Sequence, residues 1–180
     1  MFCMIVIGMI FLLEYCVKKH MERARTLQEQ RPLACGKVIL KKYYNTGAAG
    51  NFLKNHPGCV RTVHISAFIA VLAALLYVMP KKNAAAAKAG LSFLAGGGLS
   101  NLHDRLKKGY VVDYVSFGFG PKWFQNLVFN IADFFVFAGI ILCVIQSLRR
   151  EGEQGNYDST KDRFYHNITK GRFWHESSGQ

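Results

Sequence analysis

Two segments decide how the fold and function of this chain are interpreted: NLHDRLKKGYVVDYVSF, from Asn101 to Phe117, and FNIAD, from Phe129 to Asp133. Residues 1–150 contain only six acidic side chains, and the three aspartates among them all lie between positions 101 and 133. FNIAD lies within an apolar run, and carboxylates in or beside a membrane segment are costly and need a reason. We therefore treat these aspartates as candidates for chemistry and read the rest of the chain around them.

Long apolar runs surround these motifs, and each is long enough to be interpreted as a membrane helix. The third run is the weakest because it contains Lys88 and the glycine triplet at residues 96–98, but its small residues Ser92, Gly96 and Ser100 recur every four positions, which lets helices approach closely. The predicted spans are residues 1–17, 62–79, 84–102 and 128–148.

The predicted fold class is an all-α membrane protein with four transmembrane helices and a small extracytoplasmic β-rich surface loop region. Residues 37–44, KVILKKYY, have the β-branched and aromatic character of a strand. On physical grounds alone an ordinary connecting loop is the simpler interpretation of residues 18–61. We expect one four-span domain over residues 1–150 and a polar tail over residues 151–180, disordered or on the membrane surface.

The formal net charge of +12 is compatible with two classes of partner, nucleic acid and anionic lipid. Bunched apolar runs favour the membrane, since nucleic-acid binding would leave them unexplained, so no nucleic-acid partner is predicted. The five cysteines form no CxxC pair and no metal-ligand spacing. The sequence therefore predicts no metal site, no cofactor and no disulfide framework.

The three aspartates differ in their neighbours, and these neighbours indicate which of them pair. Asp113 follows a short strand-like segment, and Asp133 lies about five residues into its apolar run. We expect these two to converge at one face of the bilayer. Asp104 is followed directly by Arg105, which indicates an ion-paired, structural residue.

Two carboxylates held together in a poorly solvated site cannot both ionise comfortably, so their pKa values separate. One then acts as a base toward water and the other as an acid toward a scissile carbonyl. That is aspartic peptidase chemistry, and it needs no metal. The alternative is two separate structural aspartates. No HExxH or GxSxG pattern supports another hydrolase plan.

Five short segments, in order along residues 1 to about 150, resemble the motifs of the lipoprotein signal peptidase (signal peptidase II) family. Residues 98–105 resemble GNxxDR, residues 109–114 resemble GxVVDF, and residues 129–133 are FNxAD. Residues 45–49 look like NxGAA, and residues 14–18 occupy the place of DQxxK. The resemblance departs from the family pattern at Glu14, Gly50 and Ser100.

The resemblance implies a membrane aspartic endopeptidase of the bacterial cytoplasmic membrane. It would remove signal peptides from prolipoproteins by cutting before a diacylglyceryl-modified cysteine, as a monomer among membrane lipids. Asp113 and Asp133 would be the catalytic dyad. The supporting and substrate-binding residues would be Asn101, Asp104, Arg105, Asn130, Asn45, Glu14 and Lys18. From the residues alone, the i, i+4 spacing of the last two indicates a simple interfacial ion pair.

The distribution of basic residues and the family resemblance predict opposite orientations of the chain in the membrane. Ten Lys and Arg residues between positions 18 and 61 would place that loop in the cytoplasm. The family pattern instead implies a dyad facing the outer side and both termini in the cytoplasm, and we favour it because the charge rule is statistical. Two alternatives remain open: a non-catalytic lipoprotein-binding homologue, and a proton- or ion-coupled small transporter.

Overall fold

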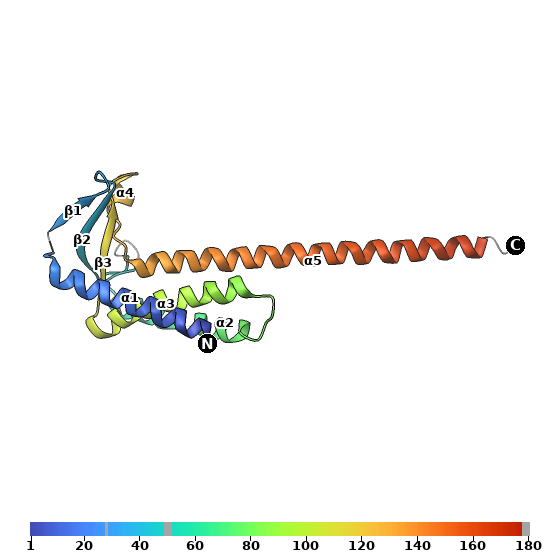
Figure 1. The fold of residues 1–180 in the computed structure, drawn as a ribbon, viewed down its shortest axis with the longest axis horizontal. Helices are drawn as coiled ribbons and strands as arrows, with labels where there is room; N and C mark the ends of the chain where they lie inside the picture. Colours follow the sequence, from blue (N-terminus) through green and yellow to red (C-terminus); the bar gives the residue numbers. More distant parts are fainter. Residues whose placement is uncertain (28, 49–51, 178–180) are drawn as a thin grey trace. The chain divides into compact units, whose positions relative to one another are not determined.

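The chain folds into five helices and a small sheet over the residues that the computed structural model describes, 1–27, 29–48 and 52–177 (Figure 1). Two compact units are present, Met1–Cys143 and Val144–Gln180. In chain order the elements are α1 (Phe2–Ala24), β1 (Gln30–Leu33), β2 (Val38–Asn45), α2 (Pro57–Val78), α3 (Ala85–Lys108), β3 (Val111–Phe117), α4 (Lys122–Gln125) and α5 (Ile131–Ser177).

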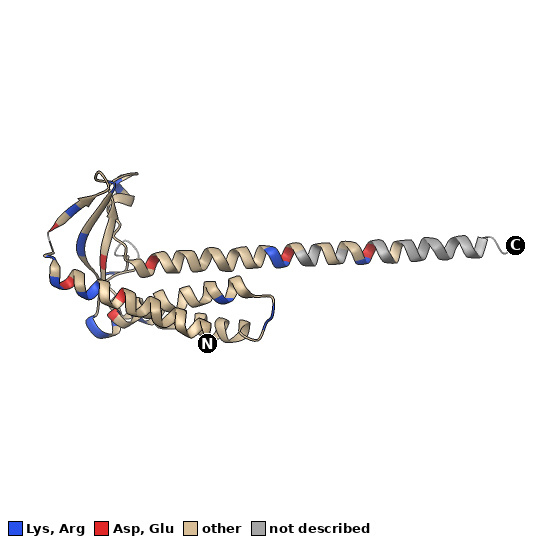
Figure 2. Cartoon of the chain, viewed as in Figure 1, with Lys and Arg blue, Asp and Glu red and all other residues tan. Residues whose placement is uncertain are grey.

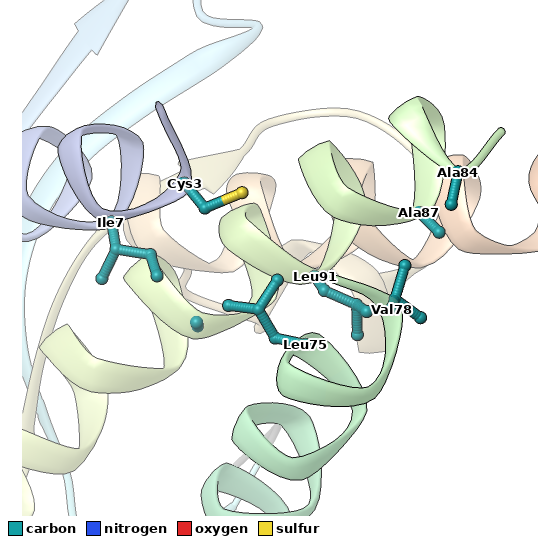
Figure 3. Close-up of a cluster of buried hydrophobic side chains, with 8 residues drawn as sticks. Cys3, Ile7, Leu75, Val78, Ala84, Ala87 and Leu91 are labelled. Carbon is teal, nitrogen blue, oxygen red and sulfur yellow. The ribbon is translucent and has the colours of Figure 1, made fainter. Parts of the chain in front are cut away.

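The apolar core of the first unit lies between α1, α2 and α3. Figure 3 shows Cys3 and Ile7 of α1 beside Leu75 of α2 and Leu91 of α3, all of them buried. Small side chains such as Ala95 complete this cluster, so the three helices pack closely around a core built of modest side chains. Burial of these side chains holds α3 in the centre of the unit.

Glycines on α3 allow its backbone to approach two neighbours. A Cβ at Gly97 would lie 2.5 Å from the carbonyl oxygen of Ala132 in α5, and one at Gly96 would lie 2.9 Å from Ile10 Cβ in α1. Real Cβ atoms do not come this close to backbone, so only glycine fits at Gly97. The small-residue pattern predicted for this segment therefore does bring helices together.

The sheet has three antiparallel strands in the order β1, β2, β3, and β3 packs against α1 and α3. The strand predicted at residues 37–44 is confirmed as β2, whereas the connecting-loop interpretation of residues 18–61 is wrong for its strands. In the register, Tyr43 lies opposite Asp113 and Asn45 opposite Val111. The end of β2 therefore lies beside the aspartate of β3.

Two helices of the described chain are long and apolar enough to cross a membrane: Pro57–Val78, and Ile131–Gly152 within α5. Both contain long stretches without an Asp, Glu, Lys or Arg side chain, from Thr62 to Val78 and from Phe134 to Leu148. Figure 2 shows the second of these as a long tan segment of α5. The prediction of four spans is thus met in part. The helices α1 and α3 fall short because ionised or small polar residues interrupt their apolar runs, Glu14 and Lys18 among them.

The second unit consists of the continuation of α5 from Val144 through Ser177. The structure therefore has a helix where the sequence indicated a disordered or surface-bound tail from Glu151 onward. A domain boundary near residue 150 stays a prediction. Gly50, the departure in the NxGAA segment, lies outside the described residues.

Gly97→Ala is expected to destabilise the protein, since its methyl group would collide with the Ala132 carbonyl at the start of α5. Overpacking of this kind costs about 1–3 kcal/mol. The neighbouring Gly98→Ala is the matched control, because its Cβ would meet only Phe68 at 3.6 Å, an ordinary contact. Thermal unfolding in detergent should show a lower midpoint for Gly97→Ala alone; equal midpoints would contradict the close approach.

Candidate active site

The first turn of α5 is closed by a reciprocal cap that involves Asn130 and Asp133. The Asp133 backbone N–H donates to Asn130 Oδ1 at 3.1 Å, and the Asn130 N–H donates to Asp133 Oδ2 at 3.0 Å. This is the geometry of a capping box, which satisfies amides that a helix start leaves free. The i, i+3 spacing in FNIAD therefore fixes the Asp133 side chain against its own helix.

The chain just before α5 is bound to β3. The amides of Tyr114 and Val115 both donate to the Phe129 carbonyl at 2.8 Å, and the Phe129 amide donates to the Val115 carbonyl at 2.7 Å. Asp113 precedes this junction and Asp133 follows it. The two aspartates are consequently brought to the same place by a strand and a capped helix.

Three asparagines hold the two carboxylates. Asn130 Nδ2 donates to Asp113 Oδ1 at 2.6 Å, and Asn45 Nδ2 donates to Asp113 Oδ2 at 2.9 Å. Asn101 Nδ2 donates to Asp133 Oδ1 at 2.9 Å. Asn130 thus contacts both aspartates, one through its side chain and the other through its backbone. The dyad is linked through a single residue.

Lys18 of α1 sets the orientation of Asn101. Its Nζ donates to Asn101 Oδ1 at 2.8 Å and to Ser100 Oγ at 3.2 Å. An ammonium has donors and no acceptor, so it binds the oxygen of the Asn101 amide and leaves the nitrogen for Asp133. Lys18 is only 2% exposed, and its charge is balanced by Asp104 at 3.0 Å.

Asp104 is a buried structural acid. It lies 3.0 Å from Lys108 as well as from Lys18, and Lys108 also pairs with Glu22 at 2.8 Å. Sequence reasoning predicted an ion-paired Asp104 and suggested Arg105 as its partner. The partners are the two lysines, because positions 104 and 105 are adjacent on a helix and point in different directions.

Arg105 instead holds the loop that follows β2. Its guanidinium donates to the carbonyl of Thr46 at 3.5 Å and to that of Gly47, and the Gly47 amide donates to Asn45 Oδ1 at 3.0 Å. The side-chain oxygen of Asn45 is therefore occupied locally, as in an Asx turn. Its amide nitrogen is left to face Asp113.

A cavity opens beside the two aspartates, with one polar and one apolar wall. The apolar wall includes Phe129, Val136 and Phe137, and His64 of α2 lines the cavity as well. The polar wall comprises Asn45, Asn101, Arg105, Asp113 and Asp133. An extended chain with apolar side chains or an attached lipid would find complementary surface here.

Burial and the neighbouring charge of Asp133 raise the pKa of Asp113 to about 7. The hydrogen bonds from Asn45 and Asn130 act in the opposite direction and are outweighed. Near neutral pH, Asp113 is therefore poised between its acid and its base form. A pair of this kind can hold one proton and use both forms in one reaction.

Five of the predicted site residues line this cavity, and Asn130 and Lys18 are hydrogen-bonded to the lining residues Asp113 and Asn101. Glu14 and Asp104 lie one contact further away, each paired with Lys18. The i, i+4 ion pair predicted in α1 is present, with Lys18 Nζ 3.8 Å from Glu14 Oε1. Its predicted interfacial position is wrong, because both side chains are buried, at 0% and 2% exposure.

Sequence reasoning missed His64 and Tyr114. His64 stands alone in an apolar run, where nothing marks it as a cavity residue. Tyr114 follows Asp113 directly, and its polar hydroxyl in an apolar segment was the one available signal. Among the described residues, no group of three or more His, Cys, Asp or Glu side chains is placed to hold a metal ion.

A family model described as signal peptidase (SPase) II matches residues 3–149. A lipoprotein signal peptidase from Moorella thermoacetica is 35% identical over 127 residues, which cover 71% of this chain and 79% of the relative. A lipoprotein signal peptidase from Caldicellulosiruptor bescii is 31% identical over 150 residues, which cover 83% of this chain and 93% of the relative.

A solved structure supports the fold. A bacterial membrane enzyme determined by the in meso method at 2.3 Å resolution matches with a TM-score of 0.71 and 23% identity. The match covers 84% of this chain and 90% of that chain. The arrangement of helices and sheet described above is therefore one that a bacterial membrane enzyme adopts.

Lys18→Met is expected to lower the free energy of unfolding by about 3–5 kcal/mol, because it leaves the buried Asp104 carboxylate short of a partner. Lys19→Met is the matched control, since Lys19 is exposed on the same turn and should cost no more than about 0.5 kcal/mol. Thermal unfolding of both variants in detergent is the measurement. Similar midpoints would show that Lys18 does not anchor the site.

Proposed function

The chain belongs to the signal peptidase II family, and from this premise we propose that it is a membrane aspartic endopeptidase that processes prolipoproteins. The resemblance drawn from its motifs is thereby confirmed. The proposed substrate is a prolipoprotein whose cysteine carries diacylglycerol, and the proposed cut frees the signal peptide before that cysteine. Both relatives named above are lipoprotein signal peptidases.

The observation that carries the proposal is the linkage of Asp113 and Asp133 through Asn130 at the wall of a cavity. Within the described chain, neither aspartate forms an ion pair with a lysine or arginine; neutral amides hold both. Carboxylates bound only by amides can still take up and release a proton. Acid–base chemistry by the pair therefore has the groups that it needs.

In the proposed reaction one carboxylate accepts a proton from a water molecule, whose oxygen attacks the scissile carbonyl carbon. The protonated partner meanwhile donates its proton to the carbonyl oxygen. When the tetrahedral intermediate collapses, the carbon–nitrogen bond breaks and a proton passes to the departing cysteine nitrogen. The products are the carboxyl end of the signal peptide and the new amino terminus of the lipoprotein.

We further propose that α1 and α3 cross the membrane together with α2 and α5, as four spans. In α1 the titratable side chains of Glu14 and Lys18 are buried, whereas Met9 and Leu12 are exposed by 65% and 60%. Such an arrangement, with charges inside and apolar side chains outside, is expected of a helix that faces lipid. In α2 the outward side chains Ile69 and Leu76 are likewise apolar and exposed.

The proposed setting is the bacterial cytoplasmic membrane, with the dyad toward the outer face and both termini in the cytoplasm. The sheet supports this arrangement, because β2 and β3 carry Asn45 and Asp113 at one end of the helices, where a polar substrate segment has access from water. Membrane lipids would surround the helices, and the protein would act as a monomer.

Replacing either aspartate by asparagine should abolish processing, with a loss of about 10²–10⁴-fold or more in kcat, because each supplies a different proton-transfer role. The assay is the gel shift of a diacylglyceryl-modified prolipoprotein incubated with purified protein. Asp162→Asn, an exposed aspartate of the second unit, is the matched control and should retain activity. Turnover at the wild-type rate by Asp113→Asn or Asp133→Asn would refute the aspartic mechanism.

Cleavage should slow as the pH rises above about 7, the pKa of Asp113. Because the pKa of Asp113 is raised, this side chain keeps its proton below about pH 7 and loses it above. At higher pH both carboxylates are therefore ionised, and neither can donate a proton to the scissile carbonyl. Initial rates measured from pH 5 to 9 with the lipid-modified precursor provide the test. A rate that rises continuously to pH 9 would contradict this assignment.

A further inference from the structure

The hydroxyl of Tyr114 joins α1 to the start of α5. It donates to Glu14 Oε2 at 2.8 Å and accepts the backbone N–H of Ile131 at 3.1 Å. Both side chains are buried, Tyr114 at 3% exposure and Glu14 at 0%. No water reaches a contact of this kind, so each hydrogen bond must be made within the protein.

Both partners of this contact depart from the family pattern described above. The DQxxK motif has aspartate at the place of Glu14, and GxVVDF has phenylalanine at the place of Tyr114. A phenylalanine ring can neither donate to a carboxylate nor accept from an amide. These two positions, 100 residues apart in sequence, meet in one hydrogen bond in this chain.

The contact lies next to both catalytic candidates without lining the cavity. Tyr114 directly follows Asp113, and Ile131 is the first residue of the helical turn that carries Asp133. The second oxygen of Glu14 lies 3.8 Å from Lys18 Nζ. Neither Glu14 nor Tyr114 is among the residues of the cavity wall, so neither is placed to touch a substrate there.

A circuit of contacts runs through the site. From Asp133 it runs to Asn101 and then to Lys18 of α1, and from Glu14 of the same helix it runs to Tyr114 and returns to α5 through the Ile131 amide. Lys18 and Glu14 are joined within α1 by the helix itself and by an ion pair of 3.8 Å, and every other step links two different elements by a hydrogen bond. A shift of α5 relative to α1 would therefore break the contact at Tyr114 and the contact at Asn101 together.

We propose that Glu14 and Tyr114 form a clamp that positions Asp113 and Asp133 for catalysis in this chain. This inference rests on the proposed function, because it assigns a positioning role within that reaction. Burial and the adjacent carboxylate raise the pKa of Tyr114, so the hydroxyl keeps the proton that it donates.

The decisive experiment is a double-mutant cycle with Glu14→Asp and Tyr114→Phe, measured as kcat and KM for a diacylglyceryl-modified prolipoprotein. Each single variant should lose about tenfold or more in kcat, because small displacements of reacting groups are costly. The KM should change less than twofold, since the clamp lies outside the cavity wall. The double variant should be no slower than either single variant, because both changes remove the same hydrogen bond.

Tyr15→Phe is the matched control, since Tyr15 lies beside Glu14 on α1 and contacts Phe11 and His103 through its ring. It should retain the wild-type kcat. Losses that multiply in the double variant, or a Tyr114→Phe enzyme with unchanged kcat, would overturn the clamp. If Tyr114→Phe does not fold, as judged by its thermal unfolding, Glu14→Asp decides alone, and a wild-type kcat in that variant would overturn the clamp.

The experiments distinguish a failure of the clamp from a failure of the proposed peptidase function. A wild-type protein that leaves the lipid-modified precursor intact would refute the function itself. An active wild type, together with an inactive Asp113→Asn and a fully active Tyr114→Phe, would refute only the clamp. The same substrate and gel-shift assay serve all of these variants.

Discussion

The ammonium of Lys18 must be neutralised inside a helix bundle, and the geometry of the site depends on how this is done. A buried charge is tolerated only when it is paired and fully hydrogen-bonded. Lys18 meets Asp104 for charge and Ser100 and Asn101 for its remaining protons. Because Lys18 binds the Asn101 oxygen, the Asn101 nitrogen must face Asp133. The need to pair a buried charge therefore also sets the orientation of the Asp133 carboxylate.

The two aspartates reach this framework from different kinds of element, and each kind adds rigidity. Asp133 lies in the first turn of a helix, where a capping box fixes its side chain. Asp113 lies on a strand that is paired on one side with β2 and on the other with Phe129. Gly97 completes the arrangement, since it allows α3 to pack directly against Ala132. Reacting groups held on such elements keep their positions better than groups on loops.

The parts of the fold and site that were predictable from the sequence are those with a short-range signature. The i, i+3 spacing of Asn130 and Asp133, the β-branched run at residues 37–44 and the apolar runs of α2 and α5 are all local patterns. The convergence of Asp113 with Asp133 was inferred from their places at the ends of neighbouring elements, and the structure links both to Asn130. The interfacial interpretation of Lys18 failed because its partner Ser100 lies 82 residues away. No local pattern encodes such a contact.

The amides around the dyad explain why the pair can function as an acid and a base. A lysine or arginine in contact with Asp113 would hold it ionised, and the acid form would disappear. Asn45 and Asn130 donate hydrogen bonds without adding a full charge, so burial still prevails and the pKa of Asp113 stays near 7. The cation of Lys18 is kept one residue further away, because it bonds to Asn101 and its charge reaches the two aspartates only at longer range. An asparagine between a lysine and an aspartate therefore fixes the position of the carboxylate without bringing a full charge into contact with it.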